Sequence, residues 1–299
     1  MINVDELRPD LFLIVAITVR IISNPFSNVL QKKLTQNRQH PLFVNFFSYL
    51  ILSVCCLFLL ADSDIRSLNS EFWIYSVLSG ITGAFGNAFI IKALEKGDLS
   101  VLGPINAYKS VIGLIFAFLL IGELPDLWGF AGIIFIIAGS YFVLKPENEK
   151  FTWSVINKPA IKFRFAALIL TGIQAVFDKK IILSSDLEMA FISWCVFGAV
   201  FSFVICRIYS IKIIEHISTM KLPVIGVYLA LCASTALMVA STNYTFRSMP
   251  VGEALALFQI SILVSVFLGY KIFQEQGFIK KLAGSIIMII GSLCILLIK

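Results

Sequence analysis

The sequence predicts an all-α integral membrane protein with ten transmembrane helices, arranged as two inverted five-helix repeats. Hydrophobic residues make up 59% of the 299-residue chain and charged residues only 14%, whereas a soluble protein has about 25% charged residues. A soluble domain of this length could not bury so much apolar surface, so lipid must solvate much of the chain. Backbone hydrogen bonding in lipid permits helices or closed barrels, and apolar runs of this length indicate helices.

Ten apolar segments are long enough to cross the hydrocarbon core, which takes about 20 helical residues. Short polar stretches such as GELPD and RSMPVG separate them. The first segment is expected to be retained and not cleaved as a signal peptide, because acidic residues precede it and polar residues interrupt it. The predicted spans are residues 11–32, 42–61, 72–94, 99–121, 127–144, 163–183, 189–209, 223–246, 251–273 and 278–298.

A long connector at residues 145–164 divides the chain into two predicted repeats, 1–148 and 149–299. A shift of 152 residues aligns the ends of the two halves, and the ordered pattern E–x7–AG–x6–GS starts at Glu123 in one and at Glu275 in the other. Because five helices is an odd number, the second half must enter the membrane from the opposite side. Inverted repeats are typical of secondary transporters, which bind substrate near the midplane between the halves.

Two segments resemble a known family: IGELPDLWGFAGIIFIIAGSYFVL at 121–144 and FQEQGFIKKLAGSIIMIIGSLCIL at 273–296. They look like the drug/metabolite transporter superfamily, EamA type, and the resemblance extends over essentially the whole chain. It departs at Gln274, where the family usually has glycine before glutamate, and at Ser23–Asn24–Pro25, where the family often has a Trp–Gly–Ser-like stretch. Members export or exchange amino acids, sugars, nucleotides and other metabolites, so the resemblance implies a transporter and leaves its substrate open.

The first predicted helix carries a polar face. Arg20, Asn24, Asn28 and Gln31 are spaced so that all four lie on one side of a helix. Such a stripe cannot face lipid, so it lines a cavity or hydrogen-bonds to a neighbouring helix. Pro25 lies within the stripe and removes one backbone hydrogen bond, which is a frequent feature of cavity-lining helices in transporters.

Lys109 lies near the centre of the fourth predicted helix. Placing an ionisable residue there costs at least about 2.5–3.5 kcal/mol, which water, a buried carboxylate or an anionic ligand must offset. Two deep cations, Arg20 and Lys109, face few deep carboxylates, and we therefore expect a cavity that binds a carboxylate or phosphate. The alternatives are a Lys109–Asp178 salt bridge, snorkelling of the lysine, or a role in proton coupling. Glu275, at a membrane edge, is expected to act as a structural cap.

Further polar and aromatic residues on the predicted helices complete a candidate cavity. Trp194 could stack on a substrate, although an aromatic residue in a membrane helix more often packs against its neighbours. The full candidate set is Arg20, Asn24, Asn28, Asn87, Asn106, Lys109, Gln174, Asp178, Trp194, Asn243 and Gln259.

Several other classes of function lack their sequence signals. No CxxC pair or histidine cluster indicates a metal, and neither a metal nor a cofactor is predicted. No DDxxD or HxxxD cluster of the kind found in membrane enzymes and no P-loop is present. The chain is therefore predicted not to be an enzyme, and an integral membrane enzyme or a passive channel remains the alternative. The expected partners are a small-molecule substrate and the lipid bilayer, with a proton or a counter-substrate for coupling. The protein is expected to be a monomer or a homodimer. No basic run with interleaved aromatics is present, so nucleic acid is not an expected partner.

Two predictions about orientation conflict. Most loop lysines and arginines lie on the side of the 145–164 connector, which by the positive-inside rule places both termini outside. The family resemblance implies that both termini are cytoplasmic. In either orientation the chain is predicted to be a multi-pass protein of the plasma membrane, or of the inner membrane in a bacterium.

Overall fold

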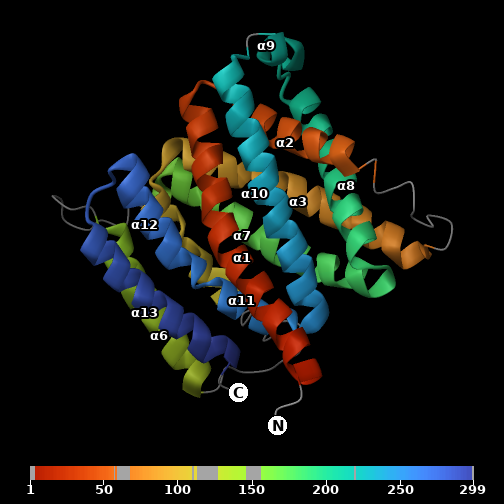
Figure 1. Ribbon diagram of the computed structural model, residues 1–299. Coiled ribbons are helices and arrows are strands. Elements are labelled where there is room, and N and C mark those ends of the chain that lie inside the picture. Colours follow the sequence, from red (N-terminus) through yellow and green to blue (C-terminus); the bar gives the residue numbers. More distant parts are fainter. Residues whose placement is uncertain are drawn as a thin grey trace.

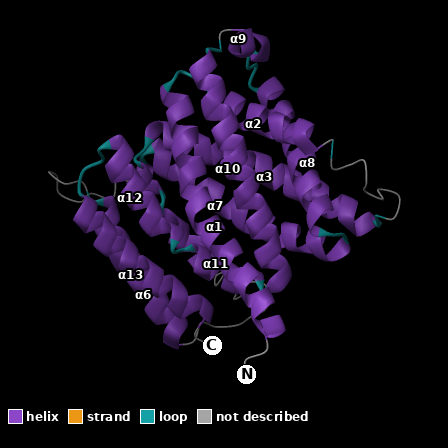
Figure 2. Cartoon of the chain, in the orientation of Figure 1, coloured by secondary structure: helices purple, strands orange, loops and turns teal. Residues whose placement is uncertain are grey.

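The computed structural model describes residues 4–56, 58, 68–109, 111–112, 127–145, 156–218 and 220–297. Within these ranges every regular element is a helix, as Figure 2 shows. Eight of the described helical spans are long and apolar enough to cross a membrane. The prediction of an all-helical, multi-pass membrane protein is confirmed, whereas the count of ten spans is not.

Figure 1 shows the helices in their order along the chain. Their bounds are α1 Val4–Gln36, α2 Pro41–Cys56, α3 Ser70–Lys96, α4 Leu99–Leu102, the 3-10 helix η3 Pro104–Ala107, α6 Leu127–Leu144, α7 Pro159–Ser184, α8 Leu187–Ile208, α9 Ile213–Ser218, α10 Leu222–Ser248, α11 Val251–Phe258, α12 Ser261–Phe273 and α13 Phe278–Leu297.

The fourth predicted span is not one regular helix. Its first turn, α4, stops at Gly103, and η3 follows from Pro104. Proline has no backbone N–H to continue the helical bonding, which explains the break. Gly103 also packs closely on α12, where an added Cβ would lie 2.6 Å from the Cβ of Ser265. Residues 113–126, which include Glu123 and the end of this span, lie outside the described residues.

The ninth predicted span is also interrupted. α11 ends at Phe258, and α12 begins three residues later at Ser261. The first span, in contrast, is longer than predicted and runs through Pro25 without interruption. Pro25 therefore lies within a continuous helix, whereas Pro104 lies at the break in the fourth span.

Helices of the first half pack mainly against helices of the second half. α3 packs along α7, α1 along α10, α2 along α8, and α6 along α13, and in Figure 1 the α6–α13 pair lies at one edge of the bundle. Hydrophobic clusters fill these interfaces, with Tyr228 and Phe43 fully buried in one of them. The central region between α1, α3, α7 and α10 is where the polar residues of these helices meet.

Small residues permit the close approach of α6 and α13. A Cβ added to Gly132 would lie 2.5 Å from the carbonyl oxygen of Gly291, and one added to Gly139 would lie 2.6 Å from that of Gly284. The contacts pair the beginning of α6 with the end of α13, so the two helices run antiparallel. Glycine at these positions lets the backbones touch, as is common between membrane helices.

Candidate functional site

A cavity of about 140 Å³ lies at the centre of the bundle. Its lining comes from α1, α2, α3, η3, α7, α8, α10 and α11 and from the segment after η3. All of the predicted site residues except Gln259 line it: Arg20, Asn24, Asn28, Asn87, Asn106, Lys109, Gln174, Asp178, Trp194 and Asn243. The polar face of α1 therefore meets the fourth span and the second-half helices in one place.

Gln259 lies elsewhere. It is buried at the C-terminal end of α11, in the break before α12, and it is not among the cavity-lining residues. The sequence predicts one regular helix over residues 251–273, whereas Gln259 lies at the interruption between α11 and α12.

Arg164 is a lining residue that the sequence analysis counted with the connector. α7 begins at Pro159, so Arg164 is carried more than one turn into the helix, and its side chain is buried. Its Nε donates a hydrogen bond of 2.8 Å to the carbonyl oxygen of Leu102, at the end of α4. The break at Gly103 and Pro104 thus provides an acceptor for this arginine. The proline at the start of α7, a favoured first helical residue, was the available sequence signal.

Lys109 projects from the segment that follows η3 and lines the cavity. No carboxylate among the described residues lies within 4.0 Å of its Nζ. Asp178, the predicted alternative partner, instead accepts a hydrogen bond from the hydroxyl of Ser79 on α3. The Lys109–Asp178 ion pair is therefore not formed in this structure.

Arg20 faces the aromatic ring of Phe258, with its guanidinium carbon 4.9 Å from the ring centroid. Its Nε and Nη1 are buried and have no hydrogen-bond partner among the described residues. A cation over an aromatic ring is attracted by the electron-rich face, but this contact satisfies no N–H group. Each buried donor without a partner costs about 1–3 kcal/mol.

A chain of amides holds one wall of the cavity in place. Gln31 donates to Asn87 over 3.2 Å, Asn87 donates to Asn45 over 2.7 Å, and Asn45 donates to Ser202 over 2.9 Å. Asn87 both lines the cavity and takes part in this chain, which fixes the orientation of its side chain. Gln31 acts between helices, whereas Asn24 and Asn28 on the same face line the cavity.

Aromatic residues form another part of the lining. Trp194 and Tyr49 both line the cavity, with ring centroids 4.6 Å apart. Asn243, opposite on α10, is buried, and its Nδ2 has no hydrogen-bond partner among the described residues. The cavity thus offers an aromatic surface and an amide donor beside the cations.

A second ionic group lies at the connector-side end of α1. Lys32 Nζ is 2.8 Å from a carboxylate oxygen of Glu275 and 2.9 Å from the carbonyl oxygen of Gly97, and it lies 4.6 Å from the ring centroid of Phe273. Both side chains are at most 9% exposed. Every charge in this group therefore has protein partners.

Glu275 also caps the start of α4. Its two carboxylate oxygens accept hydrogen bonds of 2.8 Å from the backbone N–H groups of Leu99 and Ser100. Burial alone would raise the pKa of this carboxyl, but the charge of Lys32, together with the hydrogen bonds from Lys32 and Ser100, holds the pKa below its usual value. The capping role predicted for Glu275 agrees with this geometry, and Glu123 lies outside the described residues.

A family comparison covers much of the first half of the chain. The model of the EamA-like transporter family matches residues 12–145, from within α1 to just past the end of α6. The resemblance seen in the sequence is confirmed over these residues, and the match suggests a membrane transporter.

Two curated proteins show similarity over part of the chain. Protein WALLS ARE THIN 1 of Arabidopsis thaliana is 26% identical over 122 residues, which cover 40% of this chain and 31% of that protein. An uncharacterized transporter in the cobO 3' region of a Sinorhizobium species is 36% identical over 69 residues, or 23% of this chain and 48% of that protein. The alignments thus span less than half the length of either relative.

One solved crystal structure resembles the whole bundle. It matches 93% of this chain and 96% of its own chain with a TM-score of 0.56, at 13% sequence identity. At this level of identity the likeness concerns the fold alone.

Proposed function

We propose that this chain is a secondary transporter that moves a small polar metabolite bearing a carboxylate or phosphate through the central cavity by alternating access. The EamA-like match supports a membrane transporter, and the cavity supports the substrate class. The observation that carries the proposal is the excess of positive charge among the described lining residues: Arg20, Lys109 and Arg164 against one carboxylate, Asp178.

Charge balance explains why an anion would bind there. A buried charge is stable only when a partner charge or hydrogen bonds replace its lost hydration. Asp178 already accepts a hydrogen bond from Ser79, and Arg20 keeps two unpartnered N–H groups among the described residues. Arginine suits a carboxylate or phosphate because its planar fork can donate two parallel hydrogen bonds, while lysine contributes a mobile point charge.

An amino acid is a second substrate that this lining would accept. Its carboxylate would meet the cations, and its ammonium group would meet Asp178. The remaining donors and acceptors, from Asn24, Asn28 and Asn243, would contact the rest of a polar molecule.

Many transporters that work by alternating access are built from two similar halves. We infer that residues 1–148 and 149–299 form inverted repeats. The packing supports this inference. A two-fold rotation that exchanges the halves would convert the α3–α7 contact into the α1–α10 contact and would map α2–α8 and α6–α13 onto themselves. The same rotation would exchange the Gly132–Gly291 contact with the Gly139–Gly284 contact, because both pairs are related by the shift of 152 residues.

The two ends of the cavity also carry related lysines. Lys32 and Lys179 occupy matching positions in the stretches NVLQKKL and AVFDKKI. Lys32 donates to the carbonyl of Gly97, and Lys179 donates to the carbonyls of Phe246 and Met249, the latter being Gly97 shifted by 152 residues. The two contacts lie toward opposite membrane faces, as expected for paired closures in an inverted repeat.

Transport in proteoliposomes tests the proposal. Vesicles loaded with an unlabelled carboxylate, phosphate ester, amino acid or amine are assayed for exchange with the same labelled compound outside. We expect exchange of an anion or amino acid by the parent and a loss of at least about tenfold in Lys109→Gln, since one charge-assisted hydrogen bond contributes about 1.5–3 kcal/mol.

Lys212→Gln is the matched control, because Lys212 is a lysine at the surface, paired only with the exposed Glu215. It should exchange substrate at the parent rate. The proposal would be contradicted if the parent exchanged amines as fast as anions, or if Lys109→Gln and Lys212→Gln lost exchange activity equally.

A further inference from the structure

A second cavity, of about 370 Å³, lies apart from the central one at the connector side of the bundle. It occupies the seam between the α6–α13 pair and the α3–α7 pair, and α4 forms its floor. The spans of α3, α6, α7 and α13 all begin or end around it. The cavity therefore lies at the depth where hydrocarbon gives way to lipid headgroups.

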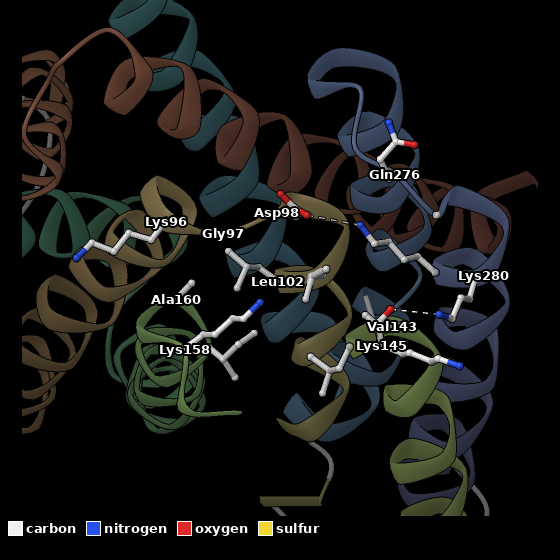
Figure 3. A pocket seen from close by; sticks show the side chains of 15 residues that line it. Lys96, Gly97, Asp98, Leu102, Val143, Lys145, Lys158, Ala160, Gln276 and Lys280 are labelled. Atoms are coloured by element: carbon white, nitrogen blue, oxygen red, sulfur yellow. Dashed lines mark hydrogen bonds and ion pairs between the residues drawn. The ribbon is translucent and has the colours of Figure 1, made fainter. Parts of the chain in front are cut away.

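The polar rim of this cavity is basic. Figure 3 shows Lys158 extending across the cavity toward Leu102, while the amine of Lys96 points away from it. Lys280 donates to the carbonyl oxygen of Lys145 over 3.2 Å (Figure 3). Lys281 is buried, donates to the hydroxyl of Ser100 over 2.8 Å and lies 3.7 Å from the carboxylate of Asp98. Among the described residues of the lining, Asp98 is the one acidic residue, against five lysines.

Helix stability does not explain three of these lysines. Lys158 is the N-terminal capping position of α7, and Lys280 and Lys281 lie in the first turn of α13. The N-terminus of a helix carries partial positive charge, so a cation there is unfavourable. In contrast, Lys96 is the last residue of α3 and Lys145 follows the end of α6, and a cation is favourable at a helix C-terminus.

Much of the remaining lining is apolar. It includes Val101, Leu102, Val143 and Ile161. A soluble phosphate would use only the basic rim, whereas a phospholipid would place its phosphate at the rim and the start of its acyl chains against these side chains. Basic pockets between membrane helices are known to hold anionic headgroups.

We propose that this cavity binds the phosphate group of an anionic phospholipid, through Lys158 and Lys280. The lipid joins the end of α6 and the start of α13 to the start of α7, so its binding stabilises the connector side of the bundle. The inference does not depend on what the central cavity transports.

Thermal unfolding of the delipidated full chain in detergent tests the proposal. Phosphatidylglycerol and phosphatidylcholine of the same chain length are titrated separately, and inorganic phosphate and glycerol phosphate form the soluble arm. We expect phosphatidylglycerol to raise the Tm and the other three to leave it unchanged. Lys158→Gln/Lys280→Gln should raise the half-saturating phosphatidylglycerol concentration on the order of tenfold.

The matched control is Lys212→Gln/Lys221→Gln, which removes two lysines from the same side of the bundle, outside the cavity. It should keep the parent response, as should Lys158→Arg/Lys280→Arg, which retains the charge if the glutamine variant does not fold. The cavity is not a specific site if the control variant needs as much more phosphatidylglycerol as Lys158→Gln/Lys280→Gln does. The same follows if phosphatidylcholine raises the Tm of the parent as much as phosphatidylglycerol does. An equal response to the soluble phosphates would overturn the lipid as its ligand.

Discussion

Lys32 and Lys109 are both lysines in membrane-embedded segments, yet their surroundings are opposite. Lys32 has a carboxylate at 2.8 Å, a carbonyl oxygen at 2.9 Å and an aromatic ring beside it. Lys109 lines a cavity with two arginines, and no carboxylate of the described residues lies within 4.0 Å. A charge whose partners are all supplied by the protein serves the fold, whereas a charge without such partners is available to a ligand.

The largest effect is expected from Lys32→Met. Removing this partner leaves the carboxylate of Glu275 buried and unpaired, which costs about 3–5 kcal/mol. Thermal unfolding should show a clear fall in Tm. The double variant Lys32→Met/Glu275→Leu should recover part of that loss, because it removes both charges; a double variant less stable than the sum of the two single changes would argue against the pair.

Arg20→Met should affect binding and spare stability. The parent buries two guanidinium N–H groups without partners among the described residues, so removing them relieves a cost, although the contact with Phe258 is lost. We expect a Tm no lower than that of the parent, and a substrate Kd raised by about tenfold to a hundredfold. A fall in Tm as large as that of Lys32→Met would show that Arg20 is a structural residue.

Asp178→Asn distinguishes the two substrate classes. The amide oxygen can still accept from Ser79, so the fold should be kept. Loss of the one negative charge in the described lining should strengthen binding of a carboxylate or phosphate several-fold and weaken binding of an amino acid by a similar factor. Isothermal titration calorimetry with both classes of compound measures whether the Kd of the variant is lower or higher than that of the parent. An unchanged Kd for both classes would place Asp178 outside the binding site.

The smallest effect concerns pH. The folded-state pKa of Glu275 lies below its unfolded value, so its contribution to stability is complete above the unfolded pKa of about 4.3 and is lost as the pH falls through the folded pKa. The Tm of the parent should therefore decline below about pH 4.3, and that of Glu275→Gln should decline less over the same range. Equal declines in the Tm of the parent and of Glu275→Gln would contradict the ion pair between Glu275 and Lys32.

Much of the fold follows from the sequence because lipid allows few choices. Apolar runs of membrane-spanning length must be helices, and the spans of α3, α7, α8 and α10 were predicted to within a few residues. The breaks at Gly103 and after Phe258 were not, since an apolar run gives no periodic signal that distinguishes a regular helix from an interrupted one.

The site was predictable in part for a related reason. Polar residues in apolar spans are costly, so most of them gather in one cavity, and Arg20, Asn24 and Lys109 were found by that rule. Arg164 was missed because it stands beside a charged connector, where its depth depends on where α7 begins. The pairing of Lys32 with Glu275 joins residues 243 positions apart and depends on tertiary packing.

Lys109 offers the most direct test of the account. The purified parent and Lys109→Gln are compared by thermal unfolding against a panel of carboxylates, phosphates, amino acids and amines. We expect an anion or amino acid to raise the Tm of the parent, by an amount equivalent to about 2.7 kcal/mol at a hundred times its Kd, and to raise that of the variant by about half as much or less at the same concentration. If no compound with an anionic group stabilises the parent, and Lys109→Gln simply melts earlier, the lysine serves the fold and the central cavity is not an anion site.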